Sequence, residues 1–553
     1  MKLEGNLVNV LTHDVYPAEV TIRKGVVEEV REVRRDFGIY LAPGFVDGHI
    51  HIESSLLAPS RFAEAALPHG TTCVIADPHE IANVLGLRGI EYMLRDASRT
   101  PLKFRFSAPS CVPATEMESA GADLSATDIE ALLSRPEFVA LGEVMNFPGV
   151  VAGDQKVMAK LEAARRAGKP IDGHAPGLTG SSLCRYVAHG ISTDHECTTL
   201  EEAREKARLG MTVQIREGSA SHDLRALLPL ISEAECMLVS DDKDPEDLLR
   251  GHMDETLRRA VEYGLDPMKA LRCVTCIPSR HYRLGPGAIV PGAPGDIVMF
   301  KSMTGFEVKK VYINGKLVAD RGRALFGFSV GKEALSLSHQ GAEGVGLAIH
   351  AKRVEPRDFA VRVKGTRARV RVIGVIEGKI LTERGTAVLK VRNGEVQPDL
   401  DADVLKLAVV DRYERGGVAN AFVRGFDLRS GALASSISHD AHNIVVVGTN
   451  SEEMASAVSL VAKFGGLAAV HGSESATLPL PVAGLMSTES ARKVARSLSA
   501  VHKFSRKLGC SLSSPFMTLS FLALLVIPEL KLGTRGLFDV REFRFVDVVE
   551  EIS

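Results

Sequence analysis

The sequence predicts an α/β fold, a closed (β/α)8 barrel of the TIM type, with a small flanking β-domain and an additional α+β domain at the C-terminal end. Two observations predict the barrel. Between Gly44 and Cys276, short apolar or β-branched segments alternate with longer amphipathic segments, which is the pattern of repeated βα units around a parallel sheet. Nearly all of the short segments end in a polar residue, as expected where catalytic groups gather at the C-terminal rim of a barrel.

The chain has 553 residues, which is enough for more than one structural unit. We expect residues 1–43 and 285–335 to form the small β-domain together, because both segments show strand-like alternation and turn signals. The barrel is expected over residues 44–284. A separate α+β domain is expected over residues 341–553, where further strand and helix patterns follow.

Eight strands are expected in the barrel, and their segments begin at Gly44, Thr71, Phe104, Phe138, Pro170, Gly190, Met211 and Cys236. The segments between the strands carry helix signals. Asp154 opens an amphipathic stretch that stops at Gly168, and Thr199 opens another with acidic residues in its first turn. Eight strands with eight crossovers predict that the barrel closes.

The polar residues at the strand ends form the most informative pattern. In chain order they are His49 and His51, Asp77 with His79 just beyond it, Glu143, His174, His195, Arg216 with Glu217, and Asp241 with Asp242. A single histidine at such a place is commonly structural, and a single aspartate is commonly a helix cap. Because these residues share one rim, their joint placement favours a metal site.

The residue types suit a hydrolase with two metal ions. His49 and His51 lie two apart on one strand, so both side chains project from the same face and can bind one cation. His174, His195 and Asp241 would supply further ligands, and Glu143 stands where a carboxylate could bridge two ions. Three or more protein ligands with an open position leave a water molecule bound and acidified.

The motifs resemble a known family. The run PGFVDGHIHIES, with later single histidines and an aspartate at strand ends, resembles the amidohydrolase superfamily. More narrowly, the resemblance is to its adenine deaminase family, through HIESS, HGTTCVIADPHEIANVLG, GEVMNFPGV, DGHAPGL, TDHE, IREGSA, SDD, HDAHNIVVVGTN, LPVAGLMS and PFMTLSFLALLVIPELKL. These segments extend over essentially the whole chain.

The resemblance implies hydrolytic deamination of adenine to hypoxanthine and ammonia, a step of purine salvage. It also implies two divalent metal ions per active site, Mn²⁺ or Fe²⁺ first and Zn²⁺ as a further possibility. A metal-activated hydroxide would attack C6, and Asp241 would move a proton from the water to the leaving nitrogen. Many relatives bridge their metals with a modified lysine, but Glu143 would serve here, since its strand supplies no lysine.

Four residues near the strand ends are expected to contact the purine ring, whose nitrogens need donors or a proton relay: Asp77, His79, Arg216 and Glu217. His79 and Glu217 are also expected to join Asp241 and Glu143 as catalytic groups. Structural alternatives stay open for two of the four. Asp77 before a proline could merely start a turn, and Glu217 could pair with Arg216.

The C-terminal segment HDAHN has two interpretations. His439, Asp440, His442 and Asn443 could form a further metal site or cap the active site. Alternatively, they form a tight turn before the apolar strand IVVVG. The apolar stretch from Pro515 to Leu532 could pack this domain on the barrel or form a lid, but it is too short and too interrupted for a membrane span.

Composition excludes several classes of function. Lys and Arg number 67 against 69 Asp and Glu, so the chain lacks the basic excess of a nucleic-acid binder. Its 8 cysteines are scattered rather than arranged as a disulfide framework, and its first residues lack the pattern of a signal peptide. We therefore expect a cytoplasmic enzyme with a small-molecule substrate and no membrane or nucleic-acid partner. We also expect a homo-oligomer, specifically a dimer.

Two rival functions stay open. A cyclic-amide hydrolase of the same superfamily would use the same metals on a carbonyl carbon, and release of ammonia would distinguish the two reactions. A non-catalytic scaffold is disfavoured, because all the expected metal ligands are present together. The chain contains no GxxxxGK[ST] phosphate loop, and its one GxSxG match, at residues 327–331, lies outside the expected barrel segment, so water is the expected nucleophile.

Overall fold

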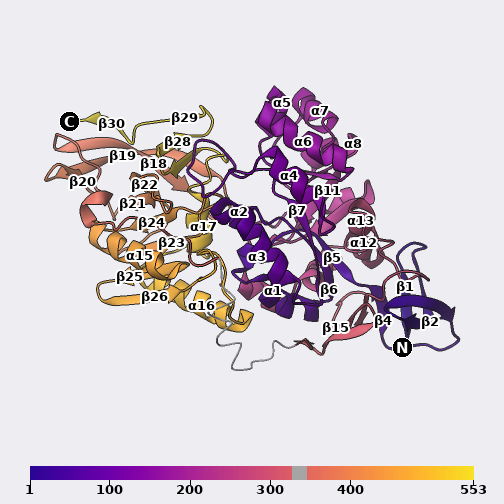
Figure 1. Ribbon diagram of the computed structural model, residues 1–553. Helices are drawn as coiled ribbons and strands as arrows, with labels where there is room; N and C mark the ends of the chain where they lie inside the picture. Colours follow the sequence, from indigo (N-terminus) through magenta and orange to yellow (C-terminus); the bar gives the residue numbers. More distant parts are fainter. Residues whose placement is uncertain (327–344) are drawn as a thin grey trace. The chain divides into compact units, whose positions relative to one another are not determined.

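The computed structural model describes residues 1–326 and 345–553, and these residues divide into two compact units. In the described ranges, the first unit holds residues 1–78, 91–111 and 124–326, and the second holds residues 79–90, 112–123 and 345–553. Figure 1 shows the course of the chain through both. Within these ranges, no helix has both the length and the apolar character that crossing a membrane requires.

Parallel strands in the first unit form the predicted barrel. One sheet has the strand order β13-β5-β6-β7-β8-β9 and the other has the order β10-β11-β12. The strands are β5 (Phe45–His51), β6 (Thr71–Ala76), β7 (Lys103–Ala108), β8 (Phe138–Val144), β9 (Ile171–Gly173), β10 (Thr193–Asp194), β11 (Thr212–Arg216), β12 (Cys236–Val239) and β13 (Asp241–Asp242). A parallel bridge between Ile171 and Ile191 links the two sheets. Because β12 leads through Ser240 into β13, which pairs with β5, the strands complete a closed circuit.

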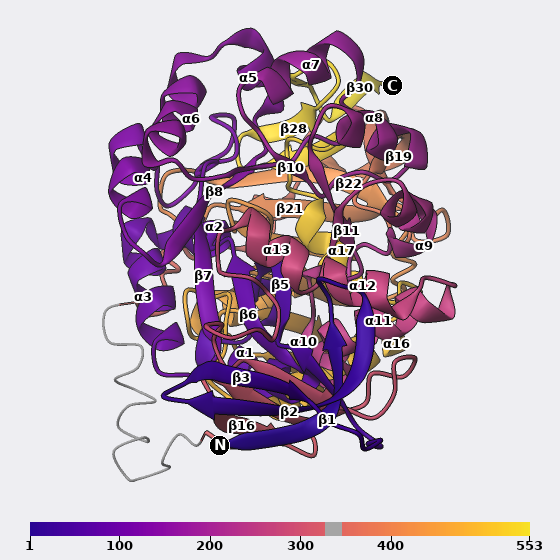
Figure 2. The ribbon, with the colours of Figure 1, turned by 90° about the vertical axis from the view of Figure 1, so that its right-hand side faces the viewer.

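Helices and short 3-10 turns connect the barrel strands, and Figure 2 shows α4 and α6 outside the neighbouring strands β7 and β8. They are η1 (Ile52–Ser55), α1 (Pro59–Ala66), η2 (Leu67–His69), α4 (Ala126–Leu133), α5 (Phe147–Ala152), α6 (Gln155–Ala167), α7 (Gly180–Ala188), α8 (Leu200–Arg208), α9 (Leu224–Leu227), η3 (Leu228–Ser232), α10 (Pro245–Arg250), α11 (Met253–Glu262), α12 (Pro267–Cys273) and α13 (Cys276–His281). Two predicted starts are confirmed. The Asp154 carboxylate accepts hydrogen bonds from two N–H groups of α6, and the Thr199 hydroxyl accepts one from α8.

A second sheet in the first unit joins the N-terminal residues to residues near position 300. Its order is β17-β16-β15-β14-β4-β1-β2-β3, from β1 (Lys2–Asn9), β2 (Asp14–Arg23), β3 (Val26–Glu32), β4 (Tyr40–Pro43), β14 (Ile297–Phe300), β15 (Val308–Ile313), β16 (Lys316–Asp320) and β17 (Arg323–Ala324). The two parts meet where β14 pairs with β4. Leu7, Val20, Leu41 and Ile297 pack in its core, so the alternation in both sequence segments reflects one buried face.

The second unit is built on a mixed sheet of order β20-β19-β18-β22-β21-β24-β23-β25-β26, with β30 beside β18. Its elements are η4 (Pro356–Phe359), β18 (Arg367–Val375), β19 (Thr382–Arg392), β20 (Glu395–Val396), β21 (Leu405–Val410), β22 (Val418–Arg424), β23 (Ala432–Ser435), β24 (Ile444–Gly448), α15 (Ser451–Phe464), β25 (Leu467–His471), β26 (Glu474–Leu478), α16 (Ala491–Lys507), α17 (Pro515–Phe521), β27 (Leu530–Gly533), β28 (Gly536–Asp539), β29 (Arg544–Phe545) and β30 (Val549–Ile552). Met454, Val458 and Val461 of α15 pack with Val446 of β24 in its core. The apolar stretch from Pro515 to Leu532 contains α17 and most of β27.

Two short segments from between the barrel strands also belong to the second unit. Residues 79–90 contain α2 (His79–Leu85) and the start of α3 (Leu87–Ala97), and residues 112–123 form a loop. The N–H of Gly121 donates to the carbonyl oxygen of Asn83 at 2.7 Å, which ties these segments together. The N–H of Thr534 donates to the carboxylate of Glu118 at 3.0 Å, which ties the loop to the C-terminal part.

Candidate metal centre

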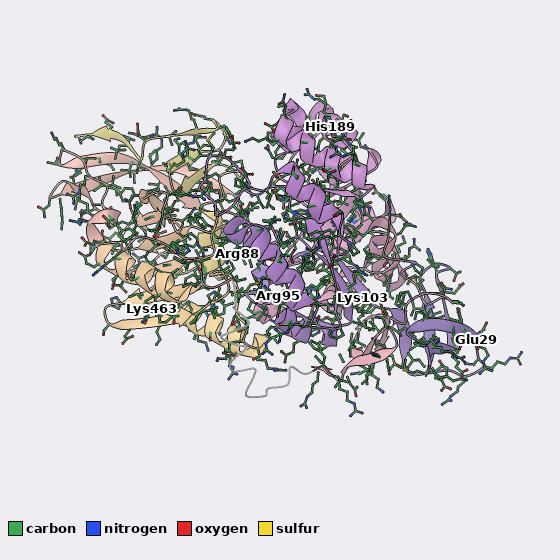
Figure 3. The ribbon with its side chains drawn as sticks, viewed as in Figure 1. Glu29, Arg88, Arg95, Lys103, His189 and Lys463 are labelled. Atoms are coloured by element: carbon green, nitrogen blue, oxygen red, sulfur yellow. The ribbon has the colours of Figure 1, made fainter. Side chains whose placement is uncertain are left out.

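Six of the predicted residues meet inside the first unit. His49 and His51 lie on β5 and Glu143 on β8, while His174 follows β9, His195 follows β10 and Asp241 lies on β13. Overlapping groups of these side chains bring their ligand atoms within 4.8 Å of one another. All are buried except His174, which is partly buried. By contrast, charged residues labelled in Figure 3, such as Glu29 of β3 and Lys463 of α15, are exposed.

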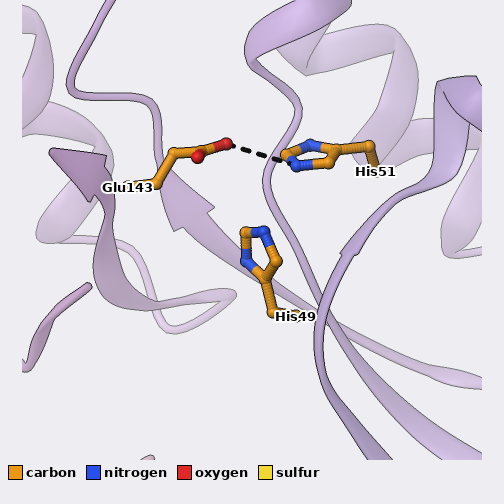
Figure 4. Close-up of side chains that lie close together, drawn as sticks. All are labelled: His49, His51 and Glu143. Carbon is orange, nitrogen blue, oxygen red and sulfur yellow. Dashed lines mark ion pairs between the residues drawn. The ribbon is translucent and has the colours of Figure 1, made fainter. Parts of the chain in front are cut away.

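His51 is the centre of one half of this cluster. Its Nε2 lies 3.2 Å from Glu143 Oε1 and 3.2 Å from Asp241 Oδ1. Figure 4 shows the rings of His49 and His51 beside the Glu143 carboxylate, with the His51 contact drawn as a dashed line. His49 Nε2 lies 3.5 Å from the same Asp241 oxygen. The two histidines of the HxH motif therefore face the same carboxylates, as their spacing predicts.

The other oxygen of Glu143 faces the second pair of histidines. Glu143 Oε2 lies 2.6 Å from His174 Nδ1 and 3.2 Å from His195 Nε2. The two imidazole nitrogens are themselves 3.1 Å apart. One carboxylate thus stands between two groups of imidazoles and offers one oxygen to each, which is the arrangement that a bridging ligand needs.

The hydrogen bonds of His51 test whether a cation fits here. A carbonyl oxygen can only accept, so the contact of 3.1 Å between His51 Nδ1 and the carbonyl of Asp77 places a proton on Nδ1. In the neutral ring, Nε2 then presents a lone pair toward two carboxylate oxygens, an arrangement that a cation between them would make favourable. His49 Nε2 is also buried and makes no hydrogen bond within the described residues. Imidazole nitrogens with carboxylate oxygens are ligands that borderline divalent ions accept, so the residues fit metal ions.

Electrostatics in the cluster favours ionised carboxylates. Burial opposes ionisation of Glu143, but the neighbouring imidazoles, His174 first and then His195 and His51, outweigh it and hold the pKa of Glu143 well below its ordinary value. Burial likewise opposes ionisation of Asp241, yet the neighbouring imidazoles of His49 and His51 keep its pKa well below the ordinary value. Both side chains are therefore anions at neutral pH, the form that binds metal.

The backbone of Asp241 is itself unusual. Its φ is 57°, in the left-handed region that residues with a side chain seldom adopt. Such a conformation costs on the order of 1–3 kcal/mol and persists where the surroundings impose it, commonly at functional sites. Asp241 pairs with Ile50 of β5, which lies between His49 and His51. The strain is therefore located among the predicted ligands.

Arg216 does not contact Glu217 in the way one sequence interpretation allowed. Its guanidinium instead pairs with Glu196, with Asp223 at 3.0 Å and with Asp241 at 3.3 Å. The carboxylate of Glu217 pairs with Arg259 and lies 3.2 Å from His222. Because side chains at adjacent positions of a strand point to opposite faces, Arg216 and Glu217 meet different neighbours.

Asp77 acts on the cluster through two groups. Its carbonyl oxygen accepts from His51, and its carboxylate accepts from the N–H of Glu143 at 3.0 Å. The first contact orients a predicted ligand and the second holds the backbone of another. His79, two residues after Asp77, begins α2 and belongs to the second unit.

Asp242 lies beside Asp241 and accepts a hydrogen bond from the hydroxyl of Ser54 at 2.5 Å.

Sequence reasoning missed Glu196 and the pair of Asp194 and Lys206. Glu196 Oε1 lies 3.6 Å from His195 Nε2 and 3.8 Å from His174 Nδ1. The ammonium of Lys206 is fully buried and donates to Asp194 at 2.9 Å. The position of Glu196 directly after a strand-end histidine was a signal that could have identified it. Lys206 gave none, since a lysine four residues after Glu202 on an amphipathic helix usually faces solvent.

Comparison with known proteins covers nearly the whole chain. Residues 40–318 match the amidohydrolase family, and residues 379–544 match the adenine deaminase C-terminal domain. The chain is 50% identical to the adenine deaminase of Methanothermobacter thermautotrophicus, over 99% of this chain and 100% of that protein. It is 46% identical to the adenine deaminase of Methanosphaera stadtmanae, over 100% of both chains. It is 44% identical to that of Salinibacter ruber, over 99% of this chain and 98% of that protein.

Proposed function

The chain belongs to the adenine deaminases of the amidohydrolase family, and we propose that it hydrolyses adenine to hypoxanthine and ammonia at two divalent metal ions in the barrel. The observation that carries the two-ion site is the position of Glu143. One of its oxygens faces His51 and the other faces His174 and His195. A carboxylate between two imidazole groups suits two ions better than one.

We assign the ligands from these contacts. His49, His51, Glu143 and Asp241 would hold one ion, and His174, His195 and Glu143 would hold the other. Ions bound there would lower the pKa of a coordinated water molecule and thereby supply the nucleophile near neutral pH. The contact of His51 Nδ1 with the Asp77 carbonyl leaves His51 Nε2 as the binding atom. Glu196 lies close enough to the second pair to orient it.

Asp241 is our proton carrier. One of its oxygens faces His49 and His51, while the other accepts from Arg216 at 3.3 Å. Its low pKa keeps it ionised, so it can take a proton from the attacking water. It would then return that proton to the exocyclic nitrogen of adenine, which departs as ammonia. Arg216 would hold the carboxylate in one orientation during both transfers.

Recognition of the base is the less constrained part of the proposal. Glu217 is buried and pairs with Arg259, and its carboxylate would accept a hydrogen bond from a ring N–H. Asp77 would act through His51 and Glu143, whose positions it fixes. Arg216 would act through Asp241, with which it pairs. His79 is retained as a catalytic and substrate-binding group, since it follows Asp77 by two residues at the end of β6.

Several finer features complete the proposal. We favour Mn²⁺ or Fe²⁺ as the native ions, with Zn²⁺ as an alternative, and a homodimer acting in the cytoplasm within purine salvage. The balanced charge of the chain agrees with a small-molecule substrate. We retain the domain limits of residues 1–43 with 285–335, 44–284 and 341–553.

One assay tests the reaction directly. Metal-depleted protein would be reloaded with manganese, iron or zinc and incubated with adenine, adenosine or cytosine, while ultraviolet absorbance and ammonia are followed. We expect ammonia and hypoxanthine in equal amounts from adenine, and only after metal is restored. If a cyclic amide were opened without ammonia and adenine were left intact, the alternative hydrolase would be the correct function.

A further inference from the structure

Asp47 is a fully buried carboxylate of the first unit that the proposed mechanism does not use. It lies on β5, two residues before His49. Because residues two apart on a strand project from the same face, Asp47 lies on the same side of β5 as the two histidines of the HxH motif. Burying a carboxylate is costly unless hydrogen bonds satisfy it. Its partners therefore indicate what this carboxylate does.

These partners include the residue directly before Asp241. Asp47 Oδ1 accepts a hydrogen bond from the backbone N–H of Ser240 at 3.2 Å, and Oδ2 accepts one from the Ser240 hydroxyl at 2.5 Å. Oδ1 also accepts from the backbone N–H of His49 at 3.4 Å. One carboxylate thus links the backbone of a predicted ligand on β5 to the backbone next to a predicted ligand on β13.

Gly218, which follows β11, shows how closely the segment around Asp241 is packed. A Cβ atom at Gly218 would lie 2.1 Å from the carbonyl oxygen of Ser240 and 2.5 Å from that of Asp242. The next backbone N–H, that of Ser219, donates to the Asp242 carbonyl oxygen at 2.7 Å. The backbone is therefore held on both sides of Asp241 along the chain.

Asp241 needs such a constraint because of its own conformation. Its φ of 57° lies in the left-handed region, which a residue with a side chain keeps only where the surroundings impose it. The contacts of Ser240 and Asp242 supply that constraint. They hold the Asp241 carboxylate where one oxygen meets His51 at 3.2 Å and the other meets Arg216 at 3.3 Å.

His252 in turn holds Asp47. Its Nε2 lies 3.1 Å from Asp47 Oδ2, and its Nδ1 lies 2.7 Å from the hydroxyl oxygen of Thr71, where β6 begins. The imidazole is fully buried, and its ring packs edge-on against Phe62 with the ring centroids 5.5 Å apart. The positions open to the Asp47 carboxylate are therefore limited from this side as well.

We propose that Asp47 is a positioning residue for the deamination, because it fixes Ser240 and thereby the place of the Asp241 carboxylate. The inference rests on the proposed function, in which Asp241 binds metal and carries the proton. Asp47 acts only through these neighbours and has no contact with the substrate. Its loss should therefore lower kcat and kcat/KM by the same factor and leave KM unchanged.

Substitutions at Asp47 in the full chain test this expectation. In metal-replete buffer, Asp47→Ala should lower kcat by about 10-fold to 100-fold, as loss of an orienting partner does. Asp47→Asn keeps an oxygen that can accept from both backbone N–H groups, so it should retain more turnover. The matched control is Asp96→Ala, which removes another buried carboxylate that accepts a backbone N–H, that of Ser60 at 2.7 Å. This control should melt at a lower temperature with kcat unchanged.

A double-variant cycle separates positioning from general damage to the fold. If Asp47 acts through Asp241, Asp47→Ala should cause little further loss of turnover in a chain that already carries Asp241→Asn, since residues that act as a unit are not additive. The same cycle is run on Co²⁺ affinity, followed by the visible absorption bands of the bound ion. Asp47→Ala should weaken Co²⁺ binding by about 10-fold to 100-fold in the wild-type background only.

Two results would overturn the proposal. One is a folded Asp47→Ala variant with the kcat and the Co²⁺ affinity of the wild type. The other is an equal loss from Asp47→Ala in both backgrounds of the cycle. If circular dichroism shows that Asp47→Ala does not fold, Ser240→Ala replaces it, because that substitution removes only the hydroxyl contact and carries the same expectations. Absence of adenine turnover in the metal-loaded wild type would contradict the proposed function alone, since the Co²⁺ cycle needs no activity.

Discussion

At the scale of single residues, Asp241 combines the features of a metal ligand with those of a proton carrier. Its left-handed backbone, its buried carboxylate and its separate neighbours at each oxygen coincide in one side chain. A ligand needs only the oxygen that faces His51. The second oxygen, which Arg216 holds, makes the residue suitable for moving a proton.

The Asp241→Asn substitution separates these two roles. The amide keeps the shape of the side chain but cannot take up a proton, so we expect turnover of adenine to fall at least ~10²-fold. Binding of adenine, measured by equilibrium dialysis, should persist. Metal content should be measured alongside, because a lost ion would mimic a lost proton carrier. Unchanged turnover would remove Asp241 from the mechanism.

Glu143→Gln tests the bridging assignment. The substitution removes the negative charge that faces both pairs of histidines, so we expect both a loss of bound metal and a large loss of turnover. Glu29→Gln is the control, since Glu29 is an exposed residue of β3 (Figure 3). Near-normal turnover of Glu143→Gln in metal-replete buffer would show that the two-ion centre is wrongly assigned.

Lys531 of the second unit gives a prediction about pH. Burial lowers its pKa to about 7, whereas an unfolded lysine titrates near about 10.4. Between these values the unfolded chain binds more protons than the folded chain, so this residue makes stability rise with pH across that window. Each unit of difference between the folded and unfolded pKa values changes the free energy of unfolding by about 1.4 kcal/mol at most.

Lys531→Met should therefore flatten the dependence of stability on pH between about 7 and 10. The readout is the melting temperature of wild type and variant across that range. Its ammonium donates to the carbonyl oxygens of Ile380 and Phe521 at 2.8 and 2.9 Å, so a uniform offset between the two proteins is expected. Parallel curves across the window would show that the lysine remains charged when folded.

At the scale of elements, two short barrel strands precede two of the predicted metal ligands. β9 and β10 have 3 and 2 residues, and the residues after them include His174 and His195. Side chains replace the missing strand contacts. Asp194 accepts from the N–H of Ala175 at 2.8 Å and from that of Glu196 at 2.9 Å, and Lys206 holds the same carboxylate. The pair therefore fixes the segments next to both histidines.

Breaking this buried pair should be costly. Lys206→Met leaves the Asp194 charge without its ammonium partner, and such losses typically cost about 3–5 kcal/mol. We expect a lower melting temperature together with weaker metal binding. The double variant Lys206→Met, Asp194→Asn should recover part of the stability, since Asp194 then no longer leaves an unpaired buried charge. A double variant no more stable than Lys206→Met would mean that the lysine stabilises by packing alone.

At the scale of the whole molecule, bound metal should stabilise the folded chain. A ligand that binds only the folded state adds about 2.7 kcal/mol at a concentration 100 times its dissociation constant. Calorimetry of the metal-depleted protein should show a lower melting temperature than the loaded protein, restored by manganese. The Glu143→Gln variant should gain less from added manganese than the wild type. An equal gain in both proteins would place the stabilising ions outside the barrel centre.

The sequence alone determined the barrel, its strand ends and the residue types at its rim. These depend on local periodicity and on the rule that parallel strands end on one side, so His49, His51, Glu143, His174, His195 and Asp241 could be brought together without coordinates. The helix starts at Asp154 and Thr199 were equally predictable, because caps are local.

Only the tertiary structure decided which groups pair inside the protein. Arg216 pairs with Glu196 and not with Glu217, and Lys206 is a buried partner of Asp194. Glu80 contacts His439, which lies 359 positions further along the chain. Such contacts depend on the directions of side chains from separate elements. Periodicity describes one element at a time and reports which face is buried, but it does not report which residue of another element lies opposite.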